Sequence, residues 1–326
     1  MDLKTLEYVV TIAQCGNISR AAEKLYITQS GLNQQLIKLE NALGLKLFER
    51  DHHHLHITKA GEIYVQNARE ILRIQRNTFT QLNDLKQDIQ GEICMGLTHE
   101  HGIDLFTAIY PKFHERFPNI SFSLVERIVG AQYRMLEEGS LDMGIVLLKK
   151  APGNISRNCV FQPIYKEDLL LGVPLNHPLA GRTVLISSGK PLRVIDLQLF
   201  AKDPFALIFD TSTMRQEVIN PMFEEYGFHP KILIETAMNS ALAQLVSKGI
   251  CCTILPHSRV MASSYRDQCA WFRMLGNPTW SVSFVHRKDY RLGGNLKYLV
   301  ELAKRYGQRL EKEFEKNSPH YRDVEK

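Results

Sequence analysis

A polar face near the N-terminus carries side chains that are suited to reading DNA bases. Leu32, Leu36, Leu39 and Leu43 recur at spacings of four, three and four, which predicts a helix with its leucines turned inward. The outward face then carries Thr28 at the helix start, followed by Gln29, Ser30, Asn33, Gln34 and Lys38. Because Asn and Gln can each form two hydrogen bonds with adenine, this face is chemically equipped for the major groove. A solvated polar helix face would have the same composition, so the neighbouring elements must decide between the two interpretations.

The residues before this helix predict two shorter helices. Apolar residues spaced three or four apart between residues 3 and 13 share one face of a first helix. A second helix fits residues 19–25, with Asn17 or Ser19 as its N-cap. Three helices with a tight turn between the second and the third form the helix-turn-helix arrangement, whose third helix lies in the major groove.

A histidine-rich segment follows the third helix. Leu55 and Ile57 alternate with polar residues, which predicts a β-hairpin, and a hairpin in this place forms a wing. We expect the wing to contact the phosphate backbone or the adjacent minor groove through Arg50, His52, His53 and His54. A metal site is the alternative interpretation, but consecutive strand residues point to opposite faces, so the three histidines cannot readily share one ion.

Residues 17–25, 28–36 and 39–50 together resemble the LysR-type transcriptional regulators. The resemblance implies a DNA-binding winged helix-turn-helix, a second domain that binds a small-molecule effector, and a homodimer or homotetramer that can engage RNA polymerase. Gly31, Asn33 and Gln34 stand where family members usually carry alanine, serine and arginine, and histidines replace a wing rich in glycine and arginine. These departures bear on sequence preference and affinity rather than on the fold.

A long linker helix is predicted from Thr58 to Gln90, where the sequence holds no proline. Its heptad core positions are Tyr64, Ala68, Ile71, Gln75, Thr78, Leu82, Leu85 and Ile89. The pattern predicts a dimerising seam, and the resemblance implies the same role. A helix packed on its own domain is the alternative.

From Gly91 onward, apolar strand patterns alternate with amphipathic helix patterns, which predicts two sets of parallel α/β structure. Residues 139–145, 176–181 and 245–256 resemble the effector domain of the same family, which is similar to periplasmic binding proteins. The predicted fold is therefore α/β: a winged helix-turn-helix (1–58), a dimerisation linker helix (59–90) and a two-lobed effector domain (91–316). Lobe I is expected at 91–165 and 271–305, lobe II at 166–270, and a disordered tail at 317–326.

Polar residues follow several of the predicted strands, where free backbone N–H groups make a site that suits anions. The candidate effector-binding residues are Thr98, His99, Glu100, Arg127, Ile128, Val129, Phe209, Thr211 and Asn239. The same strand ends also bring His101, Ser212 and Thr213 to this site. The alternative is a helix cap without any ligand for Thr98, Thr211 and Ser212, and a surface position for His101. The resemblance implies an organic acid, an amino acid or an aromatic molecule as effector.

The composition and the absence of certain motifs exclude several classes of protein but do not identify the function. The 326 residues carry a net charge of +5, but residues 1–65 hold equal numbers of basic and acidic side chains, so charge alone does not identify DNA binding. The sequence lacks a signal peptide, a membrane span, the glycine-rich and nucleophile motifs of common enzymes, and a metal-like cysteine cluster. We therefore expect a cytoplasmic regulator, neither an enzyme nor a membrane protein, with no cofactor or metal. We expect its six cysteines to be reduced thiols, and a redox-sensing pair is the alternative.

Overall fold

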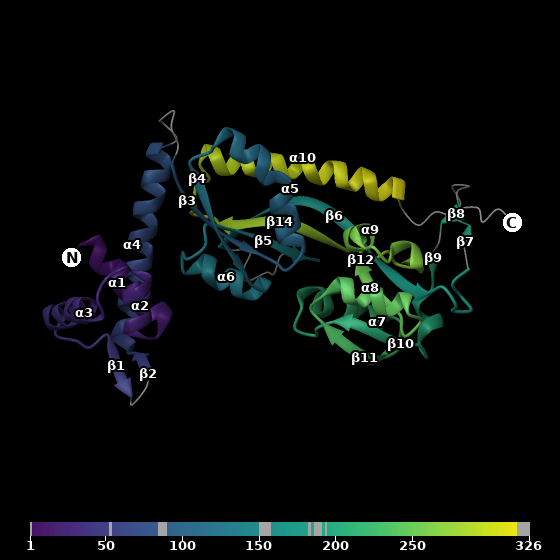
Figure 1. The fold of residues 1–326 in the computed structure, drawn as a ribbon, viewed down its shortest axis with the longest axis horizontal. Helices are drawn as coiled ribbons and strands as arrows, with labels where there is room; N and C mark the ends of the chain where they lie inside the picture. The colour runs from purple at the N-terminus through teal and green to yellow at the C-terminus, as the bar shows by residue number, and fades with distance from the viewer. Residues whose placement is uncertain are drawn as a thin grey trace.

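The computed structural model describes residues 2–51, 54–83, 90–149, 158–181, 184–185, 191–192 and 194–317. Three helices and a hairpin form the N-terminal unit: α1 (Leu3–Cys15), α2 (Ile18–Lys24), α3 (Gln29–Leu43), β1 (Phe48–Asp51) and β2 (His54–Ile57). Asp2, Asn17 and Thr28 cap the three helices through their side chains. The predicted helix-turn-helix and hairpin are thus present (Figure 1).

A buried carboxylate fixes the hairpin relative to α3. Glu40 is 5% exposed, and its Oε1 accepts hydrogen bonds from the backbone N–H groups of Leu47 at 2.9 Å and Phe48 at 3.2 Å. Its Oε2 lies 2.8 Å from Lys46 Nζ. Leu43, which was expected inside with Leu32 and Leu36, is 42% exposed because α3 ends there and Glu40 occupies the inward position one turn earlier.

The linker helix α4 (Lys59–Asn83) begins as part of the N-terminal core. Val65 and Ala68 are buried in that core, and Tyr64 packs against it, so two of the predicted seam positions face their own domain. Further along, the helix exposes Ile71, Ile74, Phe79 and Leu82, and near its start it exposes Ile63. The predicted seam positions Leu85 and Ile89 lie outside the described residues.

The C-terminal region is built on one long mixed sheet. Its order is β4-β3-β5-β14-β6-β13-β9, and β12 also pairs with β6. The strands are β3 (Gly91–Leu97), β4 (Ile120–Glu126), β5 (Met143–Leu148), β6 (Cys159–Pro174), β9 (Val194–Ile195), β12 (Thr253–Pro256), β13 (Cys269–Met274) and β14 (Thr279–Arg287). Strands β3, β4 and β5 are parallel, as predicted, but β14 runs antiparallel to β5 and β6. The sequence patterns had missed β14, which returns from late in the chain to the middle of the sheet.

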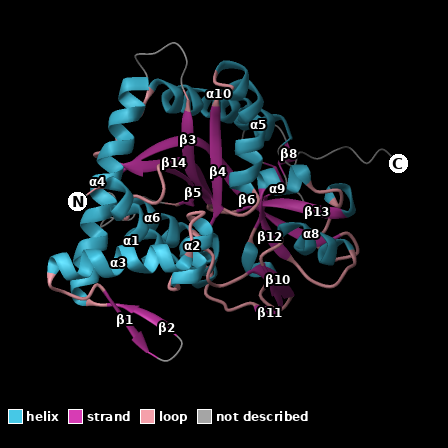
Figure 2. Ribbon diagram, turned by 60° about the vertical axis from the view of Figure 1, so that its left-hand side comes forward, coloured by secondary structure: helices cyan, strands magenta, loops and turns pink. Residues whose placement is uncertain are grey.

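Two lobes are recognisable around this sheet (Figure 2). Lobe I holds β3, β4 and β5 with α5 (His101–Arg116) and α6 (Val129–Glu137). Lobe II holds a parallel pair, β10 (Pro204–Ile208) and β11 (Lys231–Thr236), with a 3₁₀ turn (Leu197–Phe200), a π-helical turn (Arg215–Ile219), α7 (Asn220–Glu225), α8 (Asn239–Ser247), α9 (His257–Ala262) and a second 3₁₀ turn (Arg266–Gln268). The short strands β7 (Val184–Leu185) and β8 (Pro191–Leu192) pair apart from the sheet, and α10 (Gly294–Asn317) packs along β6 and α5.

Strand β6 connects the two lobes. Its first part pairs with β14 up to Asp168, and its last part pairs with β12 and β13. The predicted lobe boundary at 165/166 falls inside β6, and the one at 270/271 falls inside β13. Strand β6 therefore runs through both lobes, whereas the return from lobe II to lobe I is made by residues 275–278, between β13 and β14.

Candidate DNA-reading surface and ligand cleft

The outward face of α3 is open to solvent. Thr28, Gln29, Ser30, Gln34 and Lys38 are exposed, and Asn33 is half-buried. Helix α3 and the hairpin lie at the end of the molecule opposite lobe II, so no part of the described effector domain covers them (Figure 1). Thr28 Oγ1 accepts the backbone N–H of Gly31 at 3.1 Å, which gives this side chain a capping role as well.

The hairpin places only part of the predicted wing. The backbones of Arg50 and His54 belong to β1 and β2, but the structure does not describe their side chains. His52 and His53 lie outside the described residues. Tyr26, in the turn before α3, was not predicted to matter, yet it is 96% exposed with a φ of 54°. An aromatic side chain fully exposed at a left-handed turn is unusual, and it stands next to the reading helix.

A cleft of about 380 Å³ opens between the lobes. Six of the predicted effector-binding residues line it: Thr98, His99, Arg127, Ile128, Val129 and Asn239. Three others, Glu100, Phe209 and Thr211, are not among its lining residues. Phe209 is 47% exposed, and Ser212, Thr213 and Met214 line the cleft in that part of the chain.

Several lining residues were missed from the sequence. These are Glu126, Leu147, Ile208, Met214, Ala237 and Trp280, whereas His101, Ser212 and Thr213 lie in the strand-end segments that the sequence indicated. His101, for which a surface position was the alternative, is only 3% exposed because it begins α5 and packs edge-on against Trp280. Trp280 belongs to β14, the strand that the sequence patterns did not reveal, so its place in the cleft was not predictable.

Three buried polar atoms of cleft-lining residues have no hydrogen-bond partner among the described residues. Thr98 Oγ1 and Asn239 Oδ1 belong to side chains that are 9% and 4% exposed, and the third, His101 Nε2, lies 3.2 Å from Glu167 Oε1. The cap interpretation therefore does not fit Thr98, and the residue at the N-cap of α5 is Glu100. Ser212 does act as a cap, since its Oγ accepts the backbone N–H of Arg215 at 3.1 Å.

A buried carboxylate supports the floor of the cleft. Glu167 Oε1 accepts Trp280 Nε1–H at 2.9 Å and lies 3.2 Å from His101 Nε2, and Oε2 accepts the backbone N–H of Ser258 at 2.9 Å. Burial by itself would raise the pKa of Glu167, but the contact with His101 and the donors of Ser258 outweigh it and hold the pKa below its ordinary value. Glu167 thereby ties α5 of lobe I to α9.

Side chains at the start of α5 also reach lobe II directly. Glu100 Oε2 accepts Asn239 Nδ2–H at 2.5 Å, and Asp104 pairs with Arg259 of α9. Glu100 itself adopts φ 57° and ψ −67°, a strained backbone conformation for a residue other than glycine. A strained backbone persists only where surrounding contacts hold it, and here Glu100 bridges the two lobes beside the cleft.

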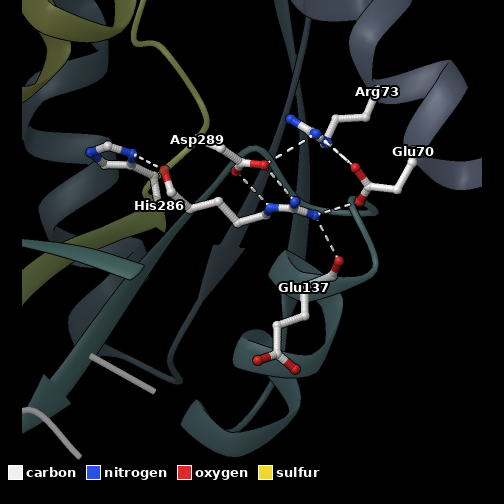
Figure 3. A network of polar contacts seen from close by, with 6 residues as sticks. Glu70, Arg73, Glu137, His286 and Asp289 are labelled. Atoms are coloured by element: carbon white, nitrogen blue, oxygen red, sulfur yellow. Dashed lines mark hydrogen bonds and ion pairs between the residues drawn. The ribbon is translucent and has the colours of Figure 1, made fainter. Parts of the chain in front are cut away.

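An ion network joins α4 to lobe I (Figure 3). Arg287 Nη1 lies 2.7 Å from Glu70 Oε1, and Arg287 Nη2 lies 2.7 Å from Asp289 Oδ2. Arg73 pairs with the same two carboxylates at 2.7 and 3.1 Å. Two arginines and two carboxylates thus form a closed set of pairs between the linker helix and the end of β14.

Comparison with known proteins identifies the family. A model described as the bacterial regulatory helix-turn-helix protein, lysR family, matches residues 3–62, and the LysR substrate binding domain matches residues 86–308. The chain belongs to the LysR family. It is a ligand-responsive, DNA-binding transcriptional regulator and not an enzyme.

The relatives agree in length and in fold. The hydrogen peroxide-inducible genes activator of Escherichia coli O6:H1 is 26% identical over 302 residues, covering 92% of this chain and 94% of its own. A full-length OxyR variant from Pseudomonas aeruginosa has a TM-score of 0.72 at 22% identity, covering 93% of this chain and 95% of its own. CbnR in complex with its target DNA has a TM-score of 0.57 at 22% identity, covering 94% and 99%.

No helix among the described residues is both long enough and apolar enough to span a membrane. The described residues also contain no cluster of three potential metal ligands.

Proposed function

We propose that this LysR family member reads operator DNA through α3, with Gln29, Ser30, Asn33, Gln34 and Lys38 in the major groove. Arg50, His52, His53 and His54 of the wing contact the phosphate backbone. The observation that carries this proposal is the exposure of Gln29 and Gln34 at the end of the molecule remote from lobe II. Amides held in this way on a short capped helix can pair with adenine without any rearrangement of the core.

The effector binds in the cleft between the lobes, in contact with Thr98, His99, Arg127, Ile128, Val129 and Asn239. Because the cleft takes residues from both lobes, a ligand there has different contacts when the lobes are open or closed, which is the condition for shifting a conformational equilibrium. The change between open and closed lobes is transmitted to the helix-turn-helix through the Glu70–Arg287 contact between α4 and lobe I.

Two exposed apolar surfaces support self-association. One is the stripe on α4 that includes Ile71, Ile74 and Leu82. The other is β11, the edge of the β10–β11 pair, which exposes Ile232, Leu233 and Ile234. Exposed apolar strips of this kind are typical of protein interfaces. We infer a homodimer that assembles into a dimer of dimers in the cytoplasm, bends or respaces bound DNA, and contacts RNA polymerase.

The test is binding of the full chain to a panel of duplex DNA at several salt concentrations. The proposal predicts that the logarithm of the affinity falls linearly with the logarithm of salt, with a strong preference for some sequences. Equal binding to all duplexes, or binding that is insensitive to salt, would remove α3 as the reading element.

Ile74→Glu tests the assembly in parallel, because a charge in the α4 stripe should lower the mass seen by light scattering.

A further inference from the structure

We propose that the cleft selects an effector that donates a hydrogen bond, through a hydroxyl or amino group on an otherwise apolar body, and that Asn239 Oδ1 is the acceptor. This inference rests on the proposed function, which places the effector in the cleft, and it names the chemistry of that effector. A carboxylate head group is disfavoured at this position.

The orientation of the Asn239 amide is fixed by its neighbour. The Glu100 carboxylate offers only acceptors, so the amide atom that faces Glu100 Oε2 at 2.5 Å must be the nitrogen. The remaining atom, Oδ1, is buried and has no partner among the described residues. A ligand that contacts this atom therefore has to bring a donor, because a second acceptor would face it with like partial charge.

A second unpaired atom comes from the opposite lobe. Thr98 Oγ1, at the end of β3, is buried and lacks a partner among the described residues. A hydroxyl oxygen can both donate and accept, so one ligand hydroxyl can donate to Asn239 and accept from Thr98. Such a ligand satisfies one atom of each lobe, which links recognition to lobe closure.

The rest of the cleft is suited to an apolar body. Its apolar lining includes Ile128, Val129, Leu147, Ile208, Met214 and Trp280. The volume of about 380 Å³ lies at the small end of the range for ligand pockets, which suits a molecule built on a single ring. The cleft wall carries Arg127 as well as Glu126, and Glu126 pairs with His99, so the selection of a donor rests on the acceptor at Asn239 and not on the net charge of the cleft.

Four probes of one shape test this inference on the full chain: benzyl alcohol, benzylamine, toluene and benzoate. Calorimetry and thermal shift should show benzyl alcohol or benzylamine binding at least about fivefold more tightly than toluene, with benzoate weakest. In Asn239→Leu, which removes the acceptor but keeps a similar volume, the donor-bearing probes should bind within about twofold of toluene. Comparison of the alcohol with the amine identifies the kind of donor.

A second variant tests the orientation argument without truncating Asn239. The Gln side chain in Glu100→Gln can donate as well as accept, which allows the Asn239 amide to turn its nitrogen toward the cleft. Benzoate should then bind at least about threefold more tightly than it binds the wild type.

Four results would overturn the inference: no preference among the probes, a preference that survives Asn239→Leu, benzoate as the tightest probe, or no binding by any of them. DNA binding measured on the same preparation separates the two proposals. If duplex DNA binding persists while the probe predictions fail, only the effector chemistry is wrong. If DNA binding fails as well, the proposed function fails.

Discussion

Arg287 and Glu70, which lie 217 positions apart in the sequence, share a hydrogen bond of 2.7 Å. The same Nη1 also donates to the backbone carbonyl of Glu137 at 2.8 Å. The guanidinium group of Arg287 thus joins Glu70 of the linker helix to the end of α6 in lobe I (Figure 3). Together with the ion pair between Arg69 and Glu138 at 3.3 Å, this contact links the effector domain to the helix that continues into the N-terminal unit.

Arg287→Met should loosen this junction. We expect the free energy of unfolding of the effector domain to fall by about 1 to 2 kcal/mol, because charged hydrogen bonds are lost at a site that solvent partly screens. Trp271 and Trp280 both lie in the effector domain, so tryptophan fluorescence in urea reports this change. Arg305→Met is the matched control, since the ion pair of Arg305 with Glu301 lies at an exposed position of α10. An equal loss in both variants would show that the junction has no special role.

The junction should also weaken in acid. Contacts with Arg287, partly opposed by burial, hold the pKa of Asp289 below its ordinary value, and for Glu70 the hydrogen bonds to Arg73 and Arg287 outweigh the rise that burial would cause. Carboxylates with lowered pKa contribute stability that is present above their unfolded-state values and is lost as pH falls through the folded-state values. Stability should therefore decline below about pH 4.5 and decline less steeply in Arg287→Met. Urea titrations between pH 7 and pH 3.5 measure the slope, and parallel curves for the two proteins would refute this account.

Sequence reasoning succeeded where local pattern decides structure. The leucine spacing, the caps and the alternation in the wing predicted α3, its start at Thr28 and the β1–β2 hairpin. It failed where distant segments meet. Trp280 lines the cleft because β14 inserts between β5 and β6, and the burial of His101 depends on Trp280 and on Glu167, which come from distant strands. Tyr64 and Ala68 illustrate the same limit, since a heptad pattern cannot reveal that its first turns pack on α1.

Thr98→Val separates a ligand contact from a structural role. Because Thr98 Oγ1 has no partner among the described residues, replacing it with a methyl group should leave the free energy of unfolding unchanged or raise it by up to about 1 kcal/mol. The effector response should be lost while DNA binding stays intact. A loss of about 1 kcal/mol or more in urea denaturation would instead support the helix-cap interpretation.

Hydrogen peroxide should not control this protein, although some of its relatives are named for that response. None of the six cysteines lines the cleft, and Cys159, Cys251, Cys252 and Cys269 are buried. Burial raises the pKa of Cys269 to about 11, whereas a reactive thiol needs a lowered pKa and access to solvent. DNA affinity before and after peroxide treatment checks this expectation, with mass spectrometry to detect oxidised thiols. A reversible change in affinity that accompanies formation of a disulfide would contradict it.

The central claim is that α3 reads DNA bases, and the affinity of Gln34→Ala for a preferred duplex tests it most directly. We predict a loss of about 5- to 100-fold at fixed salt with an unchanged salt dependence, because Gln34 is uncharged and contacts a base. Lys38→Ala should reduce the salt slope, and Gln308→Ala, an exposed glutamine on α10, should have no effect. If Gln34→Ala folds normally and binds the same duplex as tightly as the wild type, α3 does not read DNA in the way described.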